Sequence, residues 1–327
     1  MPVQSSDALV DIGAGLNGPA GLRATVYTKG LASVSALAFD SRNRLWITTA
    51  DFEDEDRDAL YVATEAGATP TKVVGALHTP MGLLWYRDSL YVASASGVDV
   101  YTGFDGTQFT THERIIELPP NVGKPGNIVL APDGRMLMGV SAPCDSCVPA
   151  SEYSAAILSF KPDGSDIAVF ASGIRAPVGL MYYPQTNDLF VTINQRDDLD
   201  PQTPGDWLSV VRQDDAWGFP ACYGQGGTAC TGVPQPIAVL DAHAAVSGVA
   251  IVTGQLGSTI GTSAVVAEWA NGKVLRVALS RDGASYTGTV HPFLTGMKNP
   301  VPAIISARGE VLVGDWSTGT VYRIAKA

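Results

Sequence analysis

The sequence is poor in charge and has no long apolar run, and each shortage excludes a class of protein. Only 16% of its 327 residues are charged, and the formal net charge is −11. Nucleic acid is therefore not an expected partner, because binding it requires a basic surface. No apolar run approaches the roughly 20 residues of a membrane-spanning helix, so no membrane span is expected.

Familiar nucleotide-binding and hydrolase motifs are also missing. No dinucleotide fingerprint, phosphate-binding loop, nucleophile elbow or zinc-protease motif stands in a supporting context. Glycine and proline, in contrast, number 35 and 21. This composition suits many short strands joined by tight turns and argues against a helical protein.

Cysteine is scarce, and its four residues form two loop pairs, Cys144 with Cys147 and Cys222 with Cys230. An even count in loops favours two disulfides and an exported protein. Free thiols, a metal site or a redox pair are the alternatives, although the second pair is too widely spaced for a zinc knuckle. Residues 1–15 lack the segments of a signal peptide. The protein is therefore either cytoplasmic or has lost a signal peptide. Given the cysteine pairs, we expect a secreted or periplasmic protein whose signal peptide is absent from this sequence.

One pattern occurs six times: an apolar strand rich in glycine or alanine, a polar turn, and a strand rich in β-forming residues. The clearest copy is PVGLMY followed by DLFVT, which begins at Pro177. The other copies begin at Ser35, Pro80, Pro125, Val246 and Val301. Repeats of about 40–50 residues with several strands each are typical of β-propellers. The sequence therefore predicts an all-β, six-bladed propeller. Two repeats are longer than the others and are expected to carry inserted loops.

The two ends of the propeller domain are predicted to close the ring together. Gly21–Tyr27 and Thr320–Ile324 both have the pattern of strands. Sharing one blade would leave no open sheet edge between them. We expect a single propeller domain over residues 21–327, preceded by an extension over 1–20. The longest insertion, 194–231, is expected to be either a functional loop or a disulfide-pinned cover over one end.

Residues just before each inner strand should meet at one mouth of the central channel. Five of these positions carry cationic or titratable side chains: His78, Lys124, Arg175, His243 and Lys298. The register therefore predicts a mouth that accepts an anion, although the protein as a whole is acidic. A small-molecule substrate or ligand is the expected partner, and the sequence does not indicate an oligomeric state.

The stretch from SAPCDSC through IRAPVGLMYY to PGDW and WGFPACYG resembles the soluble glucose/sorbosone dehydrogenases. The segments LDAHAAVSGVAIVTG and GTVYRI resemble the same family. This resemblance implies a six-bladed propeller, usually exported, with pyrroloquinoline quinone (PQQ) in the mouth and Ca²⁺ beside it. It further implies oxidation of a sugar, aldehyde or alcohol by hydride transfer to the quinone.

The resemblance assigns roles residue by residue. Arg175 matches an arginine that contacts the quinone and the substrate, and His243 matches a histidine of the sorbosone branch. Lys298 lies near a lysine that pairs with a cofactor carboxylate. His78, at a matching position of the mouth, is assigned with Arg175 and Lys298 to cofactor binding.

The metal assignment follows from the same resemblance. Asp206 matches an acidic residue associated with calcium, and Asp197 is a second candidate ligand. Trp207 stands where the family has a glutamate. Since hard cations need several oxygen ligands, further acids of this loop would have to contribute.

The main departure from the family concerns the catalytic base. Gly123 stands where the family has its catalytic histidine. A positioned base contributes roughly 10²–10⁴ in rate to alcohol oxidation, and glycine has no group that takes a proton. Lys124 and His243 are the remaining candidates, so the predicted catalytic set is Arg175, Lys124 and His243.

Two other functions remain open. A propeller derived from this family that binds a small ligand or a protein without catalysis would explain the missing base. A metal-dependent lactonase or lyase would use acid and amide ligands at the channel, for which the candidates are Asp51, Asn127, Asn194 and Asp315. Because propellers host many chemistries, the fold alone does not choose between them.

Overall fold

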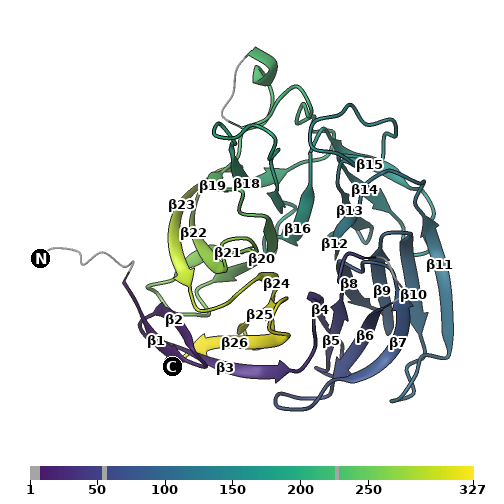
Figure 1. Cartoon of the computed structure of the whole chain (residues 1–327), viewed down its shortest axis with the longest axis vertical. Helices are drawn as coiled ribbons and strands as arrows, with labels where there is room; N and C mark the ends of the chain where they lie inside the picture. The colour runs from purple at the N-terminus through teal and green to yellow at the C-terminus, as the bar shows by residue number, and fades with distance from the viewer. Residues whose placement is uncertain (1–7, 54–56, 225–227) are drawn as a thin grey trace, which may run out of the picture.

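The computed structural model describes residues 8–53, 57–224 and 228–327. Six four-stranded antiparallel sheets surround one axis, as Figure 1 shows. The prediction of an all-β, six-bladed propeller is therefore confirmed. The described residues contain one short 3-10 helix, η1 (Thr228–Cys230), and no helix long and apolar enough to cross a membrane.

Each blade runs from an inner strand at the channel to an outer strand at the rim. Blades 1 and 2 consist of β4 (Val34–Phe39), β5 (Leu45–Thr49), β6 (Asp58–Ala63), β7 (Thr71–Leu77), and of β8 (Gly82–Tyr86), β9 (Ser89–Ser94), β10 (Gly97–Thr102), β11 (Thr111–Glu117). Blades 3 and 4 consist of β12 (Pro125–Leu130), β13 (Met136–Val140), β14 (Ala156–Phe160), β15 (Ala168–Ser172), and of β16 (Pro177–Tyr182), β17 (Leu189–Ile193), β18 (Gly205–Val211), β19 (Ala238–Ala242). Blades 5 and 6 consist of β20 (Val246–Thr253), β21 (Thr262–Glu268), β22 (Lys273–Asp282), β23 (Ser285–Leu294), and of β24 (Pro300–Ile305), β25 (Val311–Asp315), β26 (Thr320–Lys326), β3 (Leu22–Lys29).

The ring closes in blade 6, where the C-terminal strand β26 pairs with the N-terminal strand β3. This is the predicted closure by the two ends of the domain. Ahead of β3, a hairpin of β1 (Leu9–Gly13) and β2 (Leu16–Pro19) lies within the predicted extension. Leu16 is buried in the core between blades 5 and 6, and Asn17 and Thr295 exchange two backbone hydrogen bonds of 3.0 Å. The hairpin therefore packs on the propeller.

The hydrophobic core is divided into six clusters, and each fills the space between two neighbouring blades. Between blades 1 and 2, for example, Trp46 is fully buried and stacks on Trp85 at a centroid distance of 6.0 Å. Each fully buried side chain of this kind contributes roughly 1.5–3 kcal/mol by leaving water. Face-to-face packing of neighbouring sheets thus holds the ring together.

Glycine recurs in the repeat because the inner strands approach one another closely. A Cβ atom on Gly179 would lie 2.3 Å from the backbone oxygen of Ser247, and one on Gly126 would lie 2.5 Å from that of Pro177. The cavity between the inner strands measures only about 20 Å³. This is room for about one water molecule, so a larger ligand must bind at an end of the channel.

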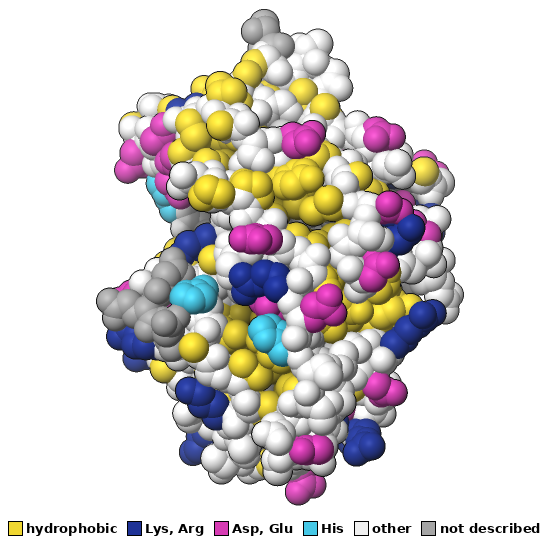
Figure 2. All heavy atoms as spheres, turned by 90° about the vertical axis from the view of Figure 1, so that its right-hand side faces the viewer, with side chains coloured by type: hydrophobic (Ala, Val, Ile, Leu, Met, Phe, Trp, Pro, Cys, Tyr) yellow, Lys and Arg dark blue, Asp and Glu magenta, His cyan; other side chains and the backbone are white. Residues whose placement is uncertain are grey.

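Both predicted disulfides are present, Cys144–Cys147 and Cys222–Cys230. The predicted insertion at 194–231 is not one loop, because the wholly buried strand β18 divides it. The part that follows β18 extends outward at the rim in Figure 1 and does not lie over the centre. Figure 2 shows that the rim beside β11 and β15 carries acidic and basic side chains interspersed with apolar patches.

Candidate site at the mouth of the propeller

All six inner strands begin at the same end of the channel, because each blade returns the chain after four antiparallel strands. We call this end the mouth. The five predicted side chains occupy the connections that lead into inner strands: His78, Lys124, Arg175, His243 and Lys298. The fold thus places them at one end, around the opening, as the register predicted. Their roles in binding and catalysis stay predictions.

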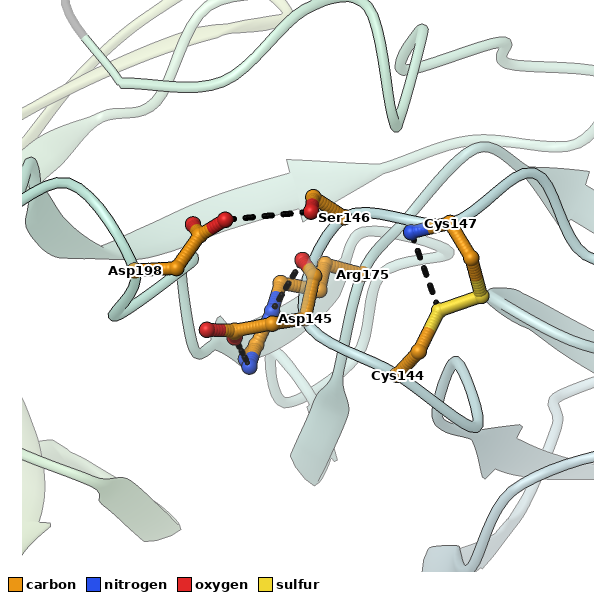
Figure 3. The surroundings of a disulfide bond; sticks show 6 residues. All are labelled: Cys144, Asp145, Ser146, Cys147, Arg175 and Asp198. Atoms are coloured by element: carbon orange, nitrogen blue, oxygen red, sulfur yellow. Dashed lines mark hydrogen bonds and ion pairs between the residues drawn. A yellow bond between two sulfur atoms is a disulfide. The ribbon is translucent and has the colours of Figure 1, made fainter.

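Arg175 is the most engaged of these residues, and its side chain is only 16% exposed. Its guanidinium donates to the Asp145 carboxylate, to the Asp145 backbone oxygen at 3.2 Å and to the Asn194 backbone oxygen at 3.4 Å. Figure 3 shows the guanidinium facing Asp145. Arg175 is therefore a positioned arginine whose charge is balanced by a neighbouring carboxylate.

Asp145 is held in place by the small ring that the Cys144–Cys147 disulfide closes (Figure 3). Inside this ring the Cys147 N–H donates to the Cys144 sulfur at 3.0 Å. The neighbouring Ser146 hydroxyl donates to Asp198 at 3.1 Å. The disulfide loop of blade 3 thus lies against the loop between β17 and β18 in blade 4.

His243 lies between two carboxylates of that blade 4 loop. Its Nδ1 atom is 3.0 Å from Asp197, and its Nε2 atom is 3.4 Å from Asp200. The side chain is 46% exposed, so it remains accessible from solvent. The backbone of His243 has a φ of 53°, a conformation that non-glycine residues seldom adopt and that often occurs at functional sites.

A chain of contacts joins Arg175 to His243 across blades 3, 4 and 5. Asp145 accepts a hydrogen bond from the Asp197 N–H at 3.2 Å, and Asp197 in turn pairs with His243. Lys124 joins the same region through the backbone: its oxygen accepts the Ser141 N–H at 3.0 Å, while the next N–H donates to Arg175. Its ammonium lies 5.2 Å from the ring centre of Phe52. Sequence reasoning missed Asp145, although its place between two cysteines was a signal.

His78 and Lys298 occupy the matching connections of blades 2 and 6. His78 is half-buried, and its backbone oxygen accepts the Ala95 N–H at 2.9 Å. Lys298 is exposed, and its backbone N–H donates to Asp315 at 2.7 Å. No described contact joins either side chain to Arg175 or His243. The described contacts link Arg175 to His243 through side chains, and Lys124 to Arg175 only through the backbone of residues 141 and 142.

The Asp206 carboxylate accepts hydrogen bonds from the backbone in this structure. It lies on β18, is 3% exposed, and accepts the N–H groups of Gln195 at 2.8 Å and Val246 at 3.2 Å. Asp58 does the same in blade 1, where it accepts the N–H groups of Asp51 and Thr79. These acids tie the start of a third strand to the mouth loops.

The stability of the fold should depend on pH through Asp206. Burial raises the pKa of its carboxyl to about 7, against the opposing effect of the two N–H donors. Between about pH 4 and pH 7 the folded chain then holds a proton that the unfolded chain has released, so the unfolding free energy falls as pH rises. Urea unfolding at pH 5 and pH 8 should show roughly 3 kcal/mol of this loss in the wild type and not in Asp206→Asn. An equal change in unfolding free energy between pH 5 and pH 8 in the wild type and in Asp206→Asn would show that the carboxylate stays ionised in the folded protein.

Among the residues that the structure describes, no three His, Cys, Asp or Glu side chains are grouped to hold a metal ion. Asp197 is paired with His243, and Asp206 is buried against backbone N–H groups. The assignment of Asp206 and Asp197 to calcium stays a prediction. Of the residues considered for a lactonase, Asn127 donates to the Leu180 backbone oxygen at 3.4 Å, and Asp315 accepts the Lys298 N–H at 2.7 Å.

No other residue fits at the position of Gly123 unless the surrounding backbone rearranges. Its φ is +105°, and a Cβ atom would lie 1.9 Å from the backbone oxygen of Ser141. The loop before β12 therefore has no room for a histidine at this position.

Gly123→Ala should destabilise the protein by about 2–5 kcal/mol, because a strained φ adds to a backbone clash. Gly134→Ala is the matched control: its φ is +87°, but a Cβ atom would meet no atom within 4 Å. The control should cost only about 1–2 kcal/mol. Chemical unfolding of both variants measures the difference, and equal losses would contradict the close approach of Ser141.

No protein-family model and no curated protein matches the chain in sequence. Its fold is similar to the holo PQQ domain of pyranose dehydrogenase from Coprinopsis cinerea, with a TM-score of 0.77, 15% identity, and 95% of this chain and 97% of that one covered. The PQQ-bound aldose sugar dehydrogenase from Streptomyces coelicolor is similar at a TM-score of 0.72 and 16% identity, covering 94% and 99%. A calcium structure of a Trichoderma reesei protein of carbohydrate-active enzyme family AA12 has a TM-score of 0.76 and 15% identity, covering 99% of each chain.

These comparisons define a class by its fold. The chain has the six-bladed propeller fold of soluble PQQ-dependent sugar dehydrogenases, so the resemblance inferred from sequence is confirmed at the level of the fold. At 15–16% identity the activity must be argued from the site itself.

PQQ is a planar quinone with three carboxylates, and the chemistry of the mouth fits such an anion in part. Arg175, Lys124 and Lys298 supply cations, and Arg175 has the fork of donors that a carboxylate accepts. Asp145 already occupies that fork. A cofactor carboxylate would therefore have to share Arg175 with Asp145 or displace it.

Proposed function

We propose that this protein is an oxidoreductase-like propeller that oxidises a sugar, aldehyde or alcohol with PQQ bound at the mouth. The contact chain from Arg175 through Asp145 and Asp197 to His243 supports the proposal most directly. This chain links an arginine suited to an anion, through two carboxylates, to a histidine suited to proton transfer. The two disulfides support the accompanying proposal that the protein is secreted or periplasmic.

The bound quinone would supply the acceptor for the hydride of the substrate. Arg175 would orient a carboxylate of the cofactor, and Lys298 and His78 would contribute further contacts around the opening. The Nε2 atom of His243 would take the hydroxyl proton of the substrate, which would have to displace the Asp200 carboxylate that now lies 3.4 Å from Nε2. Asp197 at Nδ1 would fix the orientation and tautomer of the imidazole.

Dye reduction tests the proposal directly. Purified protein would be incubated with PQQ, with and without Ca²⁺, and then offered a panel of aldoses, aldehydes and alcohols with an artificial electron acceptor. Turnover that requires both PQQ and one class of substrate supports the proposal. If PQQ binds neither with nor without Ca²⁺, the proposal is contradicted.

One observation favours a second candidate, a propeller that binds a small ligand without catalysis. Gly123 leaves no room for a side chain at the position of the family base. Saturable binding of PQQ without turnover of any substrate would favour this second function.

A further inference from the structure

A large hollow lies between blades 3 and 4 at the end of the propeller opposite the mouth. Its volume is about 980 Å³, and it is formed by the β12–β13, β14–β15 and β16–β17 turns, β15 and the start of the β18–β19 loop. These turns join first strands to second strands and third to fourth, so they lie away from the mouth. The length of β16 separates the hollow from Arg175 by about 20 Å.

The hollow continues into a second one of about 650 Å³ that reaches Tyr86 in blade 2. The two share Ala131, Pro132, Tyr182 and Asn187. Together they make one groove across three blades. We call it the basal groove and define it by the residues Ala131, Pro132, Phe170, Tyr182, Asn187 and Gln213.

The walls of the basal groove carry aromatic and aliphatic side chains among polar and charged ones. Phe170 and Tyr182 are partly buried against the core between blades 3 and 4, which fixes their rings, and Tyr86 lies at the far end. Burial raises the pKa of Tyr182, so its hydroxyl stays protonated and neutral. A fixed aromatic face suits the C–H face of a sugar ring, because the negative face of the ring attracts weakly positive hydrogens.

Two amides supply polar groups at the edge of the basal groove. Asn187 and Gln213 are exposed, and within the described part of the chain neither side chain has a hydrogen-bond partner. Each amide offers both a donor and an acceptor. This combination matches a sugar hydroxyl, which also donates and accepts.

The two arginines of the basal groove already donate hydrogen bonds within the protein. Arg135 donates to the Ser159 hydroxyl and to the Asp166 backbone oxygen, both at 2.6 Å. Arg212 donates to the Ala284 backbone oxygen at 2.6 Å and lies 3.9 Å from Asp188. The lining holds three aspartates and two arginines, so a phosphate or carboxylate would meet net negative charge, and an uncharged ligand is favoured.

We propose that the basal groove binds a neutral oligosaccharide, with its rings against Tyr182 and Phe170 and its hydroxyls on Asn187 and Gln213. The volume lies at the upper end of the range of small-ligand sites, which suits several linked sugar rings better than one. This binding is independent of the quinone and of the function proposed for the mouth.

Isothermal titration of the purified protein, without PQQ, with cellotriose, maltotriose and xylotriose tests the proposal. At least one of them should bind saturably, and Asn187→Ala combined with Gln213→Ala should weaken binding about tenfold or more. Gln108→Ala, which removes an exposed amide from blade 2, and Arg175→Ala at the mouth should leave the affinity unchanged. Hydrogen exchange of the wild type should show protection at 131–135 and 183–188 with the bound sugar.

Three results would overturn the proposal. The first is that none of the three probes binds. The second is that the folded double variant binds as tightly as the wild type. The third is that Arg175→Ala abolishes binding, which would place the sugar at the mouth. If the double variant fails to fold, the exchange pattern of the wild type decides: protection away from both turns contradicts the site. Since no quinone is present, failure here leaves the proposed function of the mouth untouched.

Discussion

Arg175→Ala is expected to weaken PQQ binding by roughly 10–150-fold, which corresponds to the 1.5–3 kcal/mol of a hydrogen bond to a charged group. Asp145→Asn is expected to have the opposite effect. Its carboxylate now occupies the Arg175 guanidinium, and a neutral amide would release that guanidinium to the cofactor. Quenching of protein fluorescence by PQQ would measure both affinities.

The control for charge is Arg196→Ala. Arg196 is also largely buried, pairs with Asp198 and lies 4.5 Å from the ring centre of Tyr223, so its loss removes the same charge from the same loop region. It should change PQQ affinity little. If Arg175→Ala unfolds the protein, Arg175 is a structural residue; if its affinity equals that of Arg196→Ala, the quinone does not contact it.

His243→Ala is expected to lower kcat by roughly 10²–10⁴, the usual contribution of a positioned base, while PQQ affinity stays the same. Asp197→Asn should lower kcat less, because the imidazole keeps its proton-accepting nitrogen and loses only the partner 3.0 Å from Nδ1. Steady-state kinetics with a saturating substrate would separate these effects. A fully active His243→Ala would exclude His243 as the base.

Lys124→Met then tests the other candidate base. Lys124 precedes blade 3, and its ammonium lies over the ring of Phe52 in the β5–β6 connection of blade 1. If His243 is the base, Lys124→Met should change PQQ affinity more than kcat. The reverse pattern would assign the proton transfer to Lys124. His112→Ala, on the outer edge of blade 2, serves as a control for loss of a histidine far from the mouth.

The fold could be predicted because the repeat combines two physical signals. Apolar strands with a glycine that permits close approach alternate with β-rich strands after polar turns, and β16 (Pro177–Tyr182) lies within one residue of its predicted start. The closure by β3 and β26 followed from the need to cover sheet edges. Strand β18 was missed because its flanking loops are rich in Asp, Pro and Gly, although GDWLSVV carries a strand pattern.

The site could be predicted only in its placement. The strand register predicted that Lys124, Arg175 and His243 lie at one mouth. It did not predict which acidic residues contact Arg175 and His243. Asp145 meets Arg175 across 30 residues of sequence through the geometry of a four-residue disulfide ring. The hydrogen bonds of Asp206 to two backbone N–H groups were not predicted either, because sequence does not reveal which side of a strand a carboxylate faces.

The most direct test of the account is a PQQ titration of the purified wild-type protein beside Arg175→Ala and Asp145→Asn, followed by protein fluorescence at fixed pH and salt. The account predicts saturable binding at one site, tighter in Asp145→Asn and weaker in Arg175→Ala. Wild-type fluorescence that changes only in proportion to added PQQ, with the same response from both variants, would contradict it.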